Sequence, residues 1–187
     1  GPCAGGAVYS PAMTDFVYMV EKTSFLFVTG PDVIKTVTHE EVTKEDLGGA
    51  SVHSETSGVA HFVASDDAAA LRQVRRLVNF LPLNNSEMPP TVSDAEPADR
   101  DCSRIFGILP ESPQKPYDIK QVIDDLVDES SFYEVQSAYA PNIVVGLARI
   151  AGRTVGLVAN HNIHLTGCLK IDASLKAARF VRFCDAF

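Results

Sequence analysis

The sequence opens with GPCAGGA (residues 1–7), in which Gly5 and Gly6 stand directly before a helix-like stretch at residues 7–10. Two glycines at a helix start let backbone N–H groups approach a ligand closely, and the helix dipole adds partial positive charge there. Such a turn can bind an anion, or an oxygen that becomes anionic during a reaction. Taken alone, the pair is explained more simply by a tight turn that needs a positive φ angle.

The longer stretch GPCAGGAVYSPAMTDF (1–16) resembles the oxyanion turn of the carboxyltransferase (β) subunits of biotin-dependent acyl-CoA carboxylases. The propionyl-CoA carboxylase and methylmalonyl-CoA carboxyltransferase branch is the most similar. Further segments agree in the same order and leave out mainly residues 83–117. These segments are FVTGPDVIK (27–35), LGGA (47–50), SGVAH (57–61), NIVVG (142–146), GRTVGLVAN (152–160) and KAARFVRFCDAF (176–187).

Composition and charge exclude several classes of function. The 187 residues carry a formal net charge of −8 and are 45% hydrophobic, which fits one globular domain or parts of two. Nucleic-acid binding requires clustered Lys and Arg, so no nucleic-acid partner is expected. The longest apolar stretch, around residues 143–145, is far shorter than a bilayer span, so no membrane partner is expected either.

The cysteines form no C-x-x-C pair, and their sparse spacing is typical of free thiols in a reducing compartment. They are Cys3, Cys102, Cys168 and Cys184. His164 and Cys168 are four residues apart, with His161 nearby, but they do not complete a ligand set. No metal is therefore expected.

The first half of the chain alternates predicted strands and helices, which indicates an α/β fold. The expected strands are residues 15–21, 24–29 and 61–64. A short helix should run from Pro31 to about Thr38, and Asp66 or Asp67 should cap an amphipathic helix reaching Leu81. The small polar residues 51–58 predict a loop. Arg72, Arg75 and Arg76 are interpreted as a solvated basic face rather than as phosphate contacts.

Residues 83–117 are rich in proline and polar residues, which predicts a linker. The expected domain bounds are 1–85, 86–116 for the linker, and 117–187. The second half should contain a helix capped by Asp118, a strand at 132–135, a hairpin of 143–150 with 154–159, and a polar loop at 160–166. Along the first of these helices, Asp124, Asp125 and Asp128 should form a solvent face.

The final helix is expected at residues 174–187, with Asp172 or Ser174 as its cap. It is apolar nearly all round and should be buried on most sides. Lys176, Arg179 and Arg182 should form a narrow polar stripe. The chain begins within one matching segment and stops within a helix, which predicts a fragment cut at both ends.

The resemblance implies a crotonase-like fold, of the ClpP/crotonase type, with two such domains in tandem. The chain would then hold the C-terminal half of the acyl-CoA-side domain and the N-terminal part of the biotin-side domain. The second oxyanion turn should lie beyond Phe187. Carried over by resemblance, the family reaction moves a carboxyl group from carboxybiotin to the α-carbon of a short acyl-CoA, most simply propionyl-CoA. A fragment lacking half of each site should be inactive alone.

The resemblance also assigns residues to roles. Backbone N–H groups of Gly5 and Gly6 would hold the oxygen of the thioester enolate. The reaction would need no protein base, because the biotin that is released can take the α-proton. Acyl-CoA-side contacts would come from Cys3, Ala4 and Ala7. On the biotin side they would come from Asn160 and Gly167, where the sequence departs from the family pattern at His161, Asn162 and Lys170.

The implied cofactor is biotin, carried as carboxybiotin by a partner, and the substrate is a coenzyme A thioester. The implied partners are a biotin carboxylase and biotin carrier (α) subunit and further copies of the chain, in a dimer-based oligomer such as a hexamer. The location would be the mitochondrial matrix in a eukaryote and the cytoplasm in a bacterium.

Several alternatives stay open. The chain could be a non-catalytic, truncated assembly piece, or part of a methylmalonyl-CoA decarboxylase or transcarboxylase subunit. A crotonase-like hydratase would need catalytic carboxylates that the sequence does not reveal. Cys3 could be a nucleophile, but packing is the simpler interpretation because no neighbouring base would activate it. His53 and His61 could contact a ligand or serve only in loop hydrogen bonds.

Overall fold

The structure, a computed structural model, describes residues 1–93, 95–112 and 114–187. Its internal contacts divide the chain into two compact units, Gly1–Val74 and Arg75–Phe187. Each unit is described by itself. The domain bounds expected from the sequence remain predictions, and positions 94 and 113 of the expected linker lie outside the described residues.

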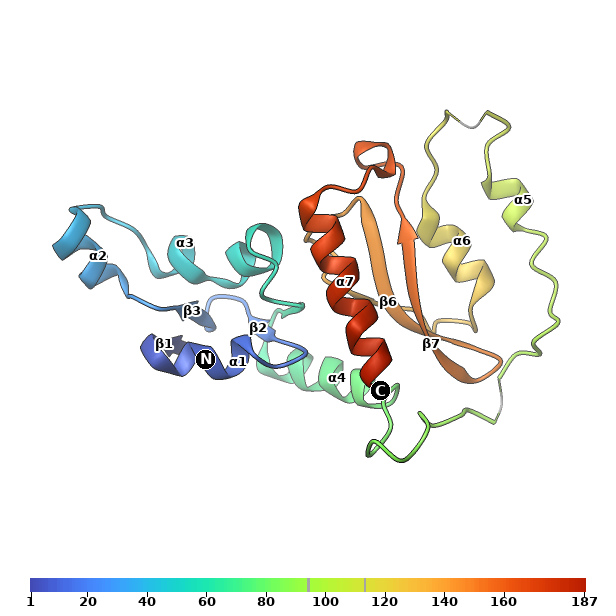
Figure 1. Cartoon of the computed structure of the whole chain (residues 1–187), viewed down its shortest axis with the longest axis horizontal. Helices are drawn as coiled ribbons and strands as arrows, with labels where there is room; N and C mark the ends of the chain where they lie inside the picture. Colours follow the sequence, from blue (N-terminus) through green and yellow to red (C-terminus); the bar gives the residue numbers. More distant parts are fainter. Residues whose placement is uncertain (94, 113) are drawn as a thin grey trace. The chain divides into compact units, whose positions relative to one another are not determined.

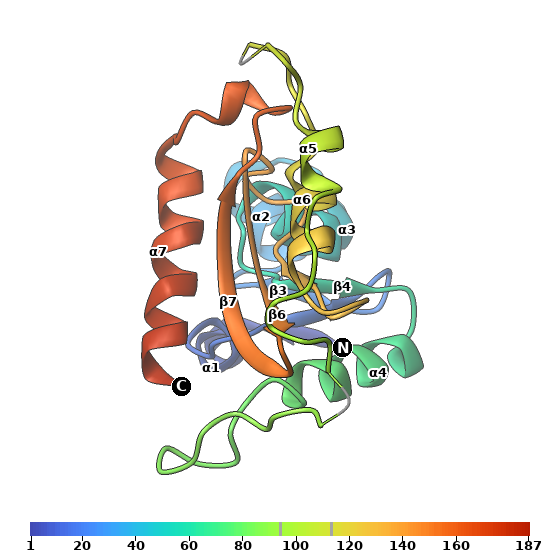
Figure 2. The ribbon, with the colours of Figure 1, turned by 90° about the vertical axis from the view of Figure 1, so that its right-hand side faces the viewer.

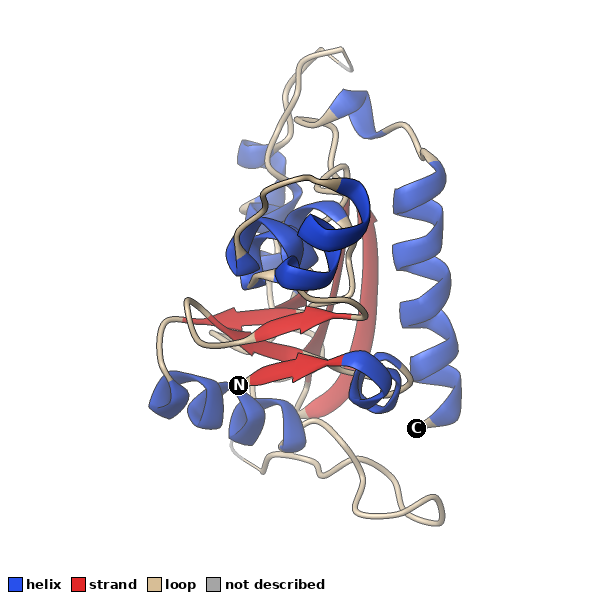
Figure 3. Ribbon diagram, turned by 90° about the vertical axis from the view of Figure 1, so that its left-hand side faces the viewer, coloured by secondary structure: helices blue, strands red, loops and turns tan. Residues whose placement is uncertain are grey.

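The first unit is built on two parallel strand pairs (Figure 3). Strand β1 (Pro2–Ala4) pairs with β3 (Phe25–Phe27), and β2 (Tyr18–Val20) pairs with β4 (Phe62–Ala64). The three strands predicted near residues 15–29 and 61–64 are confirmed, in shorter form. The core around them consists of Val8, Val17, Met19, Leu26, Ala50 and Ala60.

The helices of this unit begin at local start signals. Pro31 occupies the first turn of its helix, and the Thr43 side chain accepts a hydrogen bond from the Asp46 N–H. An oxygen of Asp66 accepts one from the Ala69 N–H at 2.7 Å, so the predicted aspartate cap is confirmed. The elements are a 3₁₀ helix (Gly5–Val8), α1 (Tyr9–Ala12), α2 (Pro31–Thr38), α3 (Lys44–Gly48) and the part of α4 (Asp67–Val78) up to Val74, since the division between the units falls within this helix.

The loop predicted at residues 51–58 is wrong, because Val52–Thr56 form a π-helical turn. The His53 ring explains the difference. Its Nδ1 lies 2.8 Å from Ser57 Oγ and its Nε2 lies 2.6 Å from the Leu26 carbonyl oxygen, which ties the turn to β3. The polar side chains that indicated a loop are therefore used inside a helical segment.

The second unit is a three-stranded antiparallel sheet with a helix on each face (Figures 1 and 2). Its strand order is β5-β6-β7, and Ile123 and Val127 pack against Val144 and Ala148 on one face. The predicted capped helix, strand and hairpin are confirmed. The elements are α5 (Ile105–Ile108), α6 (Ile119–Leu126), β5 (Tyr133–Val135), β6 (Ile143–Ile150), β7 (Arg153–Asn160), a 3₁₀ turn (Leu165–Gly167) and α7 (Ile171–Ala186).

The hairpin turn between β6 and β7 is held by a carboxylate. Ala151 and Gly152 both have positive φ angles, of 50° and 75°. The Asp128 carboxylate accepts hydrogen bonds from both of their N–H groups, at 2.9 and 2.7 Å. The Gly152 carbonyl in turn accepts a hydrogen bond from the Val92 N–H at 3.1 Å. Gly152 is therefore in close contact both with the Asp128 carboxylate and with the backbone of Val92.

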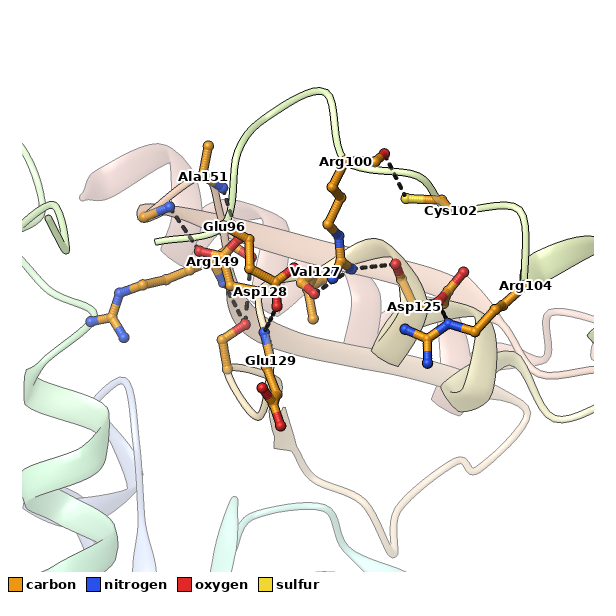
Figure 4. Close-up of polar contacts among 12 residues, drawn as sticks. Glu96, Arg100, Cys102, Arg104, Asp125, Val127, Asp128, Glu129, Arg149 and Ala151 are labelled. Atoms are coloured by element: carbon orange, nitrogen blue, oxygen red, sulfur yellow. Dashed lines mark hydrogen bonds and ion pairs between the residues drawn. The ribbon is translucent and has the colours of Figure 1, made fainter. Parts of the chain in front are cut away.

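Part of the proline-rich stretch is anchored to this unit (Figure 4). The Arg100 guanidinium pairs with Glu96 and donates to the carbonyls of Asp125 and Val127 at the end of α6. Arg104 pairs with the Asp125 carboxylate at 2.9 Å, and that carboxylate is buried. The expected solvent face of α6 is therefore wrong for Asp125 and Asp128, because each has a specific partner.

Two further expectations about helix faces are corrected. Arg76 is not merely solvated: it donates to the Ser130 and Phe132 carbonyls at 3.1 and 2.8 Å and lies over the Tyr133 ring. Helix α7 begins after Lys170 rather than at the predicted aspartate or serine cap. None of the helices in the described part of the chain is long and apolar enough to cross a bilayer.

The polar stripe predicted on α7 is wrong at Lys176, which is only 2% exposed, whereas Leu175 and Val181 are more than half exposed. The helix is thus not buried on most sides. Its buried side chains are Ala173, Lys176, Phe180 and Phe183. Their spacing of three and four residues places them on one face of the helix, and this face lies against the sheet.

Gly152→Ala should lower the free energy of unfolding by roughly 2 kcal/mol or more, from the left-handed φ and from overpacking. An added Cβ would lie 2.3 Å from the Val92 carbonyl oxygen. Urea denaturation followed by circular dichroism measures the change. Gly107→Ala is the matched control, because its Cβ would meet no atom within 4 Å. Equal stability of the two variants would contradict the packing argument.

Candidate functional site

The glycine turn follows β1 and is fixed by the pairing of that strand. Ala4 is extended, with φ −138° and ψ 157°, and Gly5 then takes a φ of 64°. The Gly5 N–H donates to the Val28 carbonyl oxygen at 3.1 Å, which continues the contact between β1 and β3. Gly5 is therefore needed for its backbone angle, and its N–H already has an acceptor within the chain.

Gly6 differs from Gly5 in both respects. It is exposed, its φ is not positive, and no atom lies within 4 Å of the position that a Cβ would occupy. It is the second residue of the 3₁₀ helix, where an N–H has no carbonyl of a preceding turn to donate to. Within the described chain, neither a positive φ nor close packing requires a glycine at this position.

The neighbours of the turn are small and accessible. Ala4 and Ala7 are exposed on either side of the two glycines, so they border the open space beside Gly6. Cys3 is half-buried and packs against the core cluster of the first unit, which is the simpler of its two interpretations. A ligand at this turn would therefore meet backbone N–H groups and small side chains rather than a charged or nucleophilic group.

The two histidines near this unit's core are used in protein contacts. The buried His61 accepts a hydrogen bond from the Val17 N–H at its Nδ1, at 3.1 Å, and its ring meets Phe16 edge-on. His53 connects Ser57 to Leu26. These contacts support hydrogen bonding within the protein as the role of both rings.

Asn160 and Gly167, the residues expected on the biotin side, bind one another in the second unit. The Asn160 amide donates to the Gly167 carbonyl at 2.8 Å and closes the loop between β7 and α7. Three consecutive residues of this loop have positive φ, at 49° for Leu165, 53° for Thr166 and 72° for Gly167. At the two non-glycine residues such angles cost free energy and persist only where surrounding contacts impose them, whereas Gly167 adopts its angle without strain.

Two of the three departures from the family pattern have structural roles here. His161 is buried, and its Nε2 lies 3.2 Å from an Asp118 oxygen. The Asn162 side-chain oxygen accepts from the Tyr117 N–H at 3.1 Å. Both residues therefore tie the loop to the start of α6. Lys170 is exposed at the cap of α7 and leaves a positive charge at that position.

Sequence reasoning missed two residues that shape this loop. Asn142 donates from its side chain to the Cys168 carbonyl at 2.6 Å, and its own carbonyl accepts from the His161 N–H at 2.9 Å. Lys176 lies beneath the segment that carries Asn142. Its position three residues after Ala173 and four before Phe180, on a face that is otherwise apolar, is a signal that could have identified it.

No group of three His, Cys, Asp or Glu side chains in the described ranges could hold a metal ion. The rings of His161 and His164 lie 5.0 Å apart, and Cys168 lies 3.5 Å from the Thr166 hydroxyl.

A family model described as "Carboxyl transferase domain" matches residues 1–187. The chain belongs to this family. It is 57% identical to the propionyl-CoA carboxylase beta chain of Roseobacter denitrificans, covering all of this chain and 37% of that protein. It is 53% identical to the methylmalonyl-CoA decarboxylase subunit alpha of Veillonella parvula, again with full coverage of this chain and 37% of the relative. The chain thus spans little more than a third of these relatives.

Solved structures show the fold. A structure of transcarboxylase 12S with methylmalonyl-coenzyme A and methylmalonic acid bound superposes with a TM-score of 0.95 at 48% identity, over all of this chain and 36% of the other. A single-chain, multi-domain long-chain acyl-CoA carboxylase matches at a TM-score of 0.83 and 24% identity, over all of this chain and 18% of the other. The expected α/β, crotonase-like fold is confirmed.

Gly5→Ala and Gly6→Ala should separate the roles of the two glycines. Gly5→Ala should lower the free energy of unfolding by about 1–2 kcal/mol, because Ala resists a positive φ. Gly6→Ala should change it by less than about 0.5 kcal/mol, as for an ordinary surface substitution. Thermal and urea unfolding of the two variants test this, and a large loss for Gly6→Ala would show that Gly6 has a structural role.

Proposed function

We propose that the chain is part of a carboxyltransferase subunit that moves a carboxyl group from carboxybiotin to the α-carbon of a short acyl-CoA, propionyl-CoA foremost. The observation that carries the proposal is Gly6, an exposed glycine at a helix start, where no atom of the described residues lies within 4 Å of the position that a Cβ would occupy. The similarity to propionyl-CoA carboxylase beta chains over the whole chain supports the same reaction.

In this proposal the turn stabilises negative charge on the thioester oxygen. When the α-proton leaves, the thioester becomes an enolate, and a fixed backbone donor lowers the free energy of that state more than that of the neutral thioester. One such donor is typically worth ~10²–10³ in rate. The Gly5 N–H could act as a second donor only by leaving Val28, so Gly6 is the stronger of the two.

The small side chains around the turn suit this role. Cys3, Ala4 and Ala7 leave room for a thioester, and none of them offers a competing base beside the acidic α-carbon. Val8 is the first buried residue after the glycines, and it joins the turn to the core. The reaction asks for positioned donors rather than a nucleophile, which agrees with the residue types present at the turn.

The loop of residues 160–168 is proposed for the biotin side, with Asn160 and Gly167 fixing its shape. Ile163 and Leu165 on this loop are about half exposed and offer apolar contacts, while the backbone offers hydrogen-bonding groups. This combination fits a bicyclic ring system with a polar ureido group. Biotin, carried by a biotin carboxylase and carrier subunit, would supply the carboxyl group in the form of carboxybiotin.

The proposed oligomeric state and location are based on the relatives. Transcarboxylase 12S is described as a hexamer assembly, and a dimer-based oligomer, such as a hexamer, is proposed here too. The relatives from Homo sapiens and Sus scrofa are named as mitochondrial. The proposed location is accordingly the mitochondrial matrix in a eukaryote and the cytoplasm in a bacterium. Each active site would be completed by segments outside residues 1–187, so the chain alone should be inactive.

A second candidate is a methylmalonyl-CoA decarboxylase or transcarboxylase subunit, which the 53% identity to the Veillonella parvula protein favours. All these reactions pass through the same enolate, so the glycine turn serves each of them. Assaying the full-length subunit with carboxybiotin and propionyl-CoA, and with methylmalonyl-CoA alone, separates transfer from simple decarboxylation. A non-catalytic assembly piece would instead give neither activity and would fail to bind coenzyme A thioesters.

In the full-length subunit, Gly6→Ala should reduce kcat/KM for carboxylation of propionyl-CoA by at least about tenfold, because its methyl group enters the space proposed for the thioester. The assay follows incorporation of labelled carboxyl groups from carboxybiotin. Gly107→Ala, also in open space, is the control and should keep full activity. An active Gly6→Ala enzyme would refute the assignment of this site.

A further inference from the structure

Lys176 is a charged side chain inside the second unit. Only 2% of the residue is exposed, and its Nζ is surrounded by backbone carbonyl oxygens. The distances are 2.8 Å to Gln136, 2.7 Å to Tyr139, 2.9 Å to Ile143 and 3.5 Å to Ala140. All four acceptors belong to the segment 136–143, which runs from the end of β5 to the first residue of β6 and therefore wraps around one ammonium group.

A charge in this position is costly, so its acceptors must be well placed. Burial lowers the pKa of Lys176 to about 8, the Glu134 carboxylate opposes this, and Lys120 adds to it. The four hydrogen bonds from Nζ all go to backbone carbonyls, which stabilise the ammonium through their dipoles. Removing the ammonium would leave several buried carbonyl oxygens without the hydrogen bonds that they accept from it.

The segment around the ammonium adopts an unusual backbone. Gln136 and Ala140 have φ angles of 53° and 44°, although neither is a glycine. Each such residue costs of order 1–2 kcal/mol. These turns direct carbonyls of the segment toward one point, and the Lys176 ammonium occupies that point. The contacts therefore give a reason for the strain.

The same segment holds the loop at residues 160–168. The Asn142 side chain donates to the Cys168 carbonyl at 2.6 Å, and the Asn142 carbonyl accepts from the His161 N–H at 2.9 Å. The Pro141 carbonyl lies 3.2 Å from His161 Nδ1. The loop is thus attached at both of its ends to residues 141 and 142 of the segment that also contacts Lys176.

We propose that Lys176 is a positioning residue, which sets the place of loop 160–168 through segment 136–143 and thereby shapes the biotin side of the active site. The last step rests on the proposed function. A lysine that only stabilised the fold would affect both substrates alike. A positioning lysine instead affects the biotin side selectively, because the acyl-CoA turn belongs to the other unit.

The test uses the full-length subunit and the reverse transfer, in which methylmalonyl-CoA and free biotin give propionyl-CoA and carboxybiotin. The carbon–carbon bond to the carboxyl group breaks, a nitrogen–carbon bond forms on biotin, and the biotin N–H proton goes to the α-carbon. Lys176→Met removes the ammonium and keeps an unbranched side chain that ends at the ε position. Arg182→Met, on an exposed face of the same helix, is the matched control.

Lys176→Met should raise the KM for biotin by at least about tenfold, since a misplacement of ~1 Å can cost ~10²-fold. The KM for methylmalonyl-CoA should stay within about twofold, and Arg182→Met should change neither. Asn142→Ala breaks the next link and should act in the same direction, so it tests the proposal if Lys176→Met does not fold. Equal rises in both KM values, or no rise in either, would overturn it.

Hydrogen exchange gives a readout that does not depend on activity. Amides of 160–168 should exchange faster in Lys176→Met than in wild type or Arg182→Met, together with amides of 136–143. An inactive wild-type subunit would refute the proposed function but leave this measurement in force. Unchanged exchange at 160–168 with faster exchange at 136–143 would refute the positioning role while leaving the proposed function intact.

Discussion

An ammonium group taken out of water must find acceptors, and in the second unit this requirement connects three elements. Lys176 on α7 meets four carbonyls of the segment between β5 and β6. The segment can present those carbonyls only by turning through left-handed backbone angles, which it does at Gln136 and Ala140. The position of α7 on the sheet, the path of the segment and the loop attached to it are therefore consequences of one charge.

The same reliance on backbone groups organises the rest of the second unit. The Asp128 carboxylate fixes the hairpin turn through two N–H groups. The Arg100 guanidinium satisfies carbonyls at the end of α6, where a helix has none of its own donors left. In each case a charged side chain from one segment completes the hydrogen bonding of another. Such charge-assisted bonds are stronger than neutral ones, which suits a small sheet with few layers.

Sequence patterns predicted the features that depend on local spacing. Three such features could be predicted, namely the hairpin of β6 and β7, the Asp118 cap and the helix that begins at Pro31. Hydrophobic period, caps and turns are each encoded within a few neighbouring residues. Contacts between residues that lie far apart in the sequence could not be predicted in this way. The sequence predicts a narrow polar stripe for Lys176 and a solvent face for Asp125, because no local pattern shows which carbonyls or arginines will meet them. The α3 helix was missed, although Thr43 and Asp46 form a reciprocal cap that the sequence displays.

The glycine turn combines the two kinds of information. The residue type alone indicates that Gly5 and Gly6 could present backbone donors. Only the structure shows that the two glycines have different roles. Gly5 accepts the left-handed angle and donates to Val28, which anchors the turn on β3. That anchor fixes the backbone at the residue directly before Gly6. A backbone donor cannot be repositioned by a rotamer change, so its placement depends on strand pairing one residue earlier. A site built this way contains few side chains that a sequence pattern could reveal. The position of its donor is set by the strand pairing directly before it.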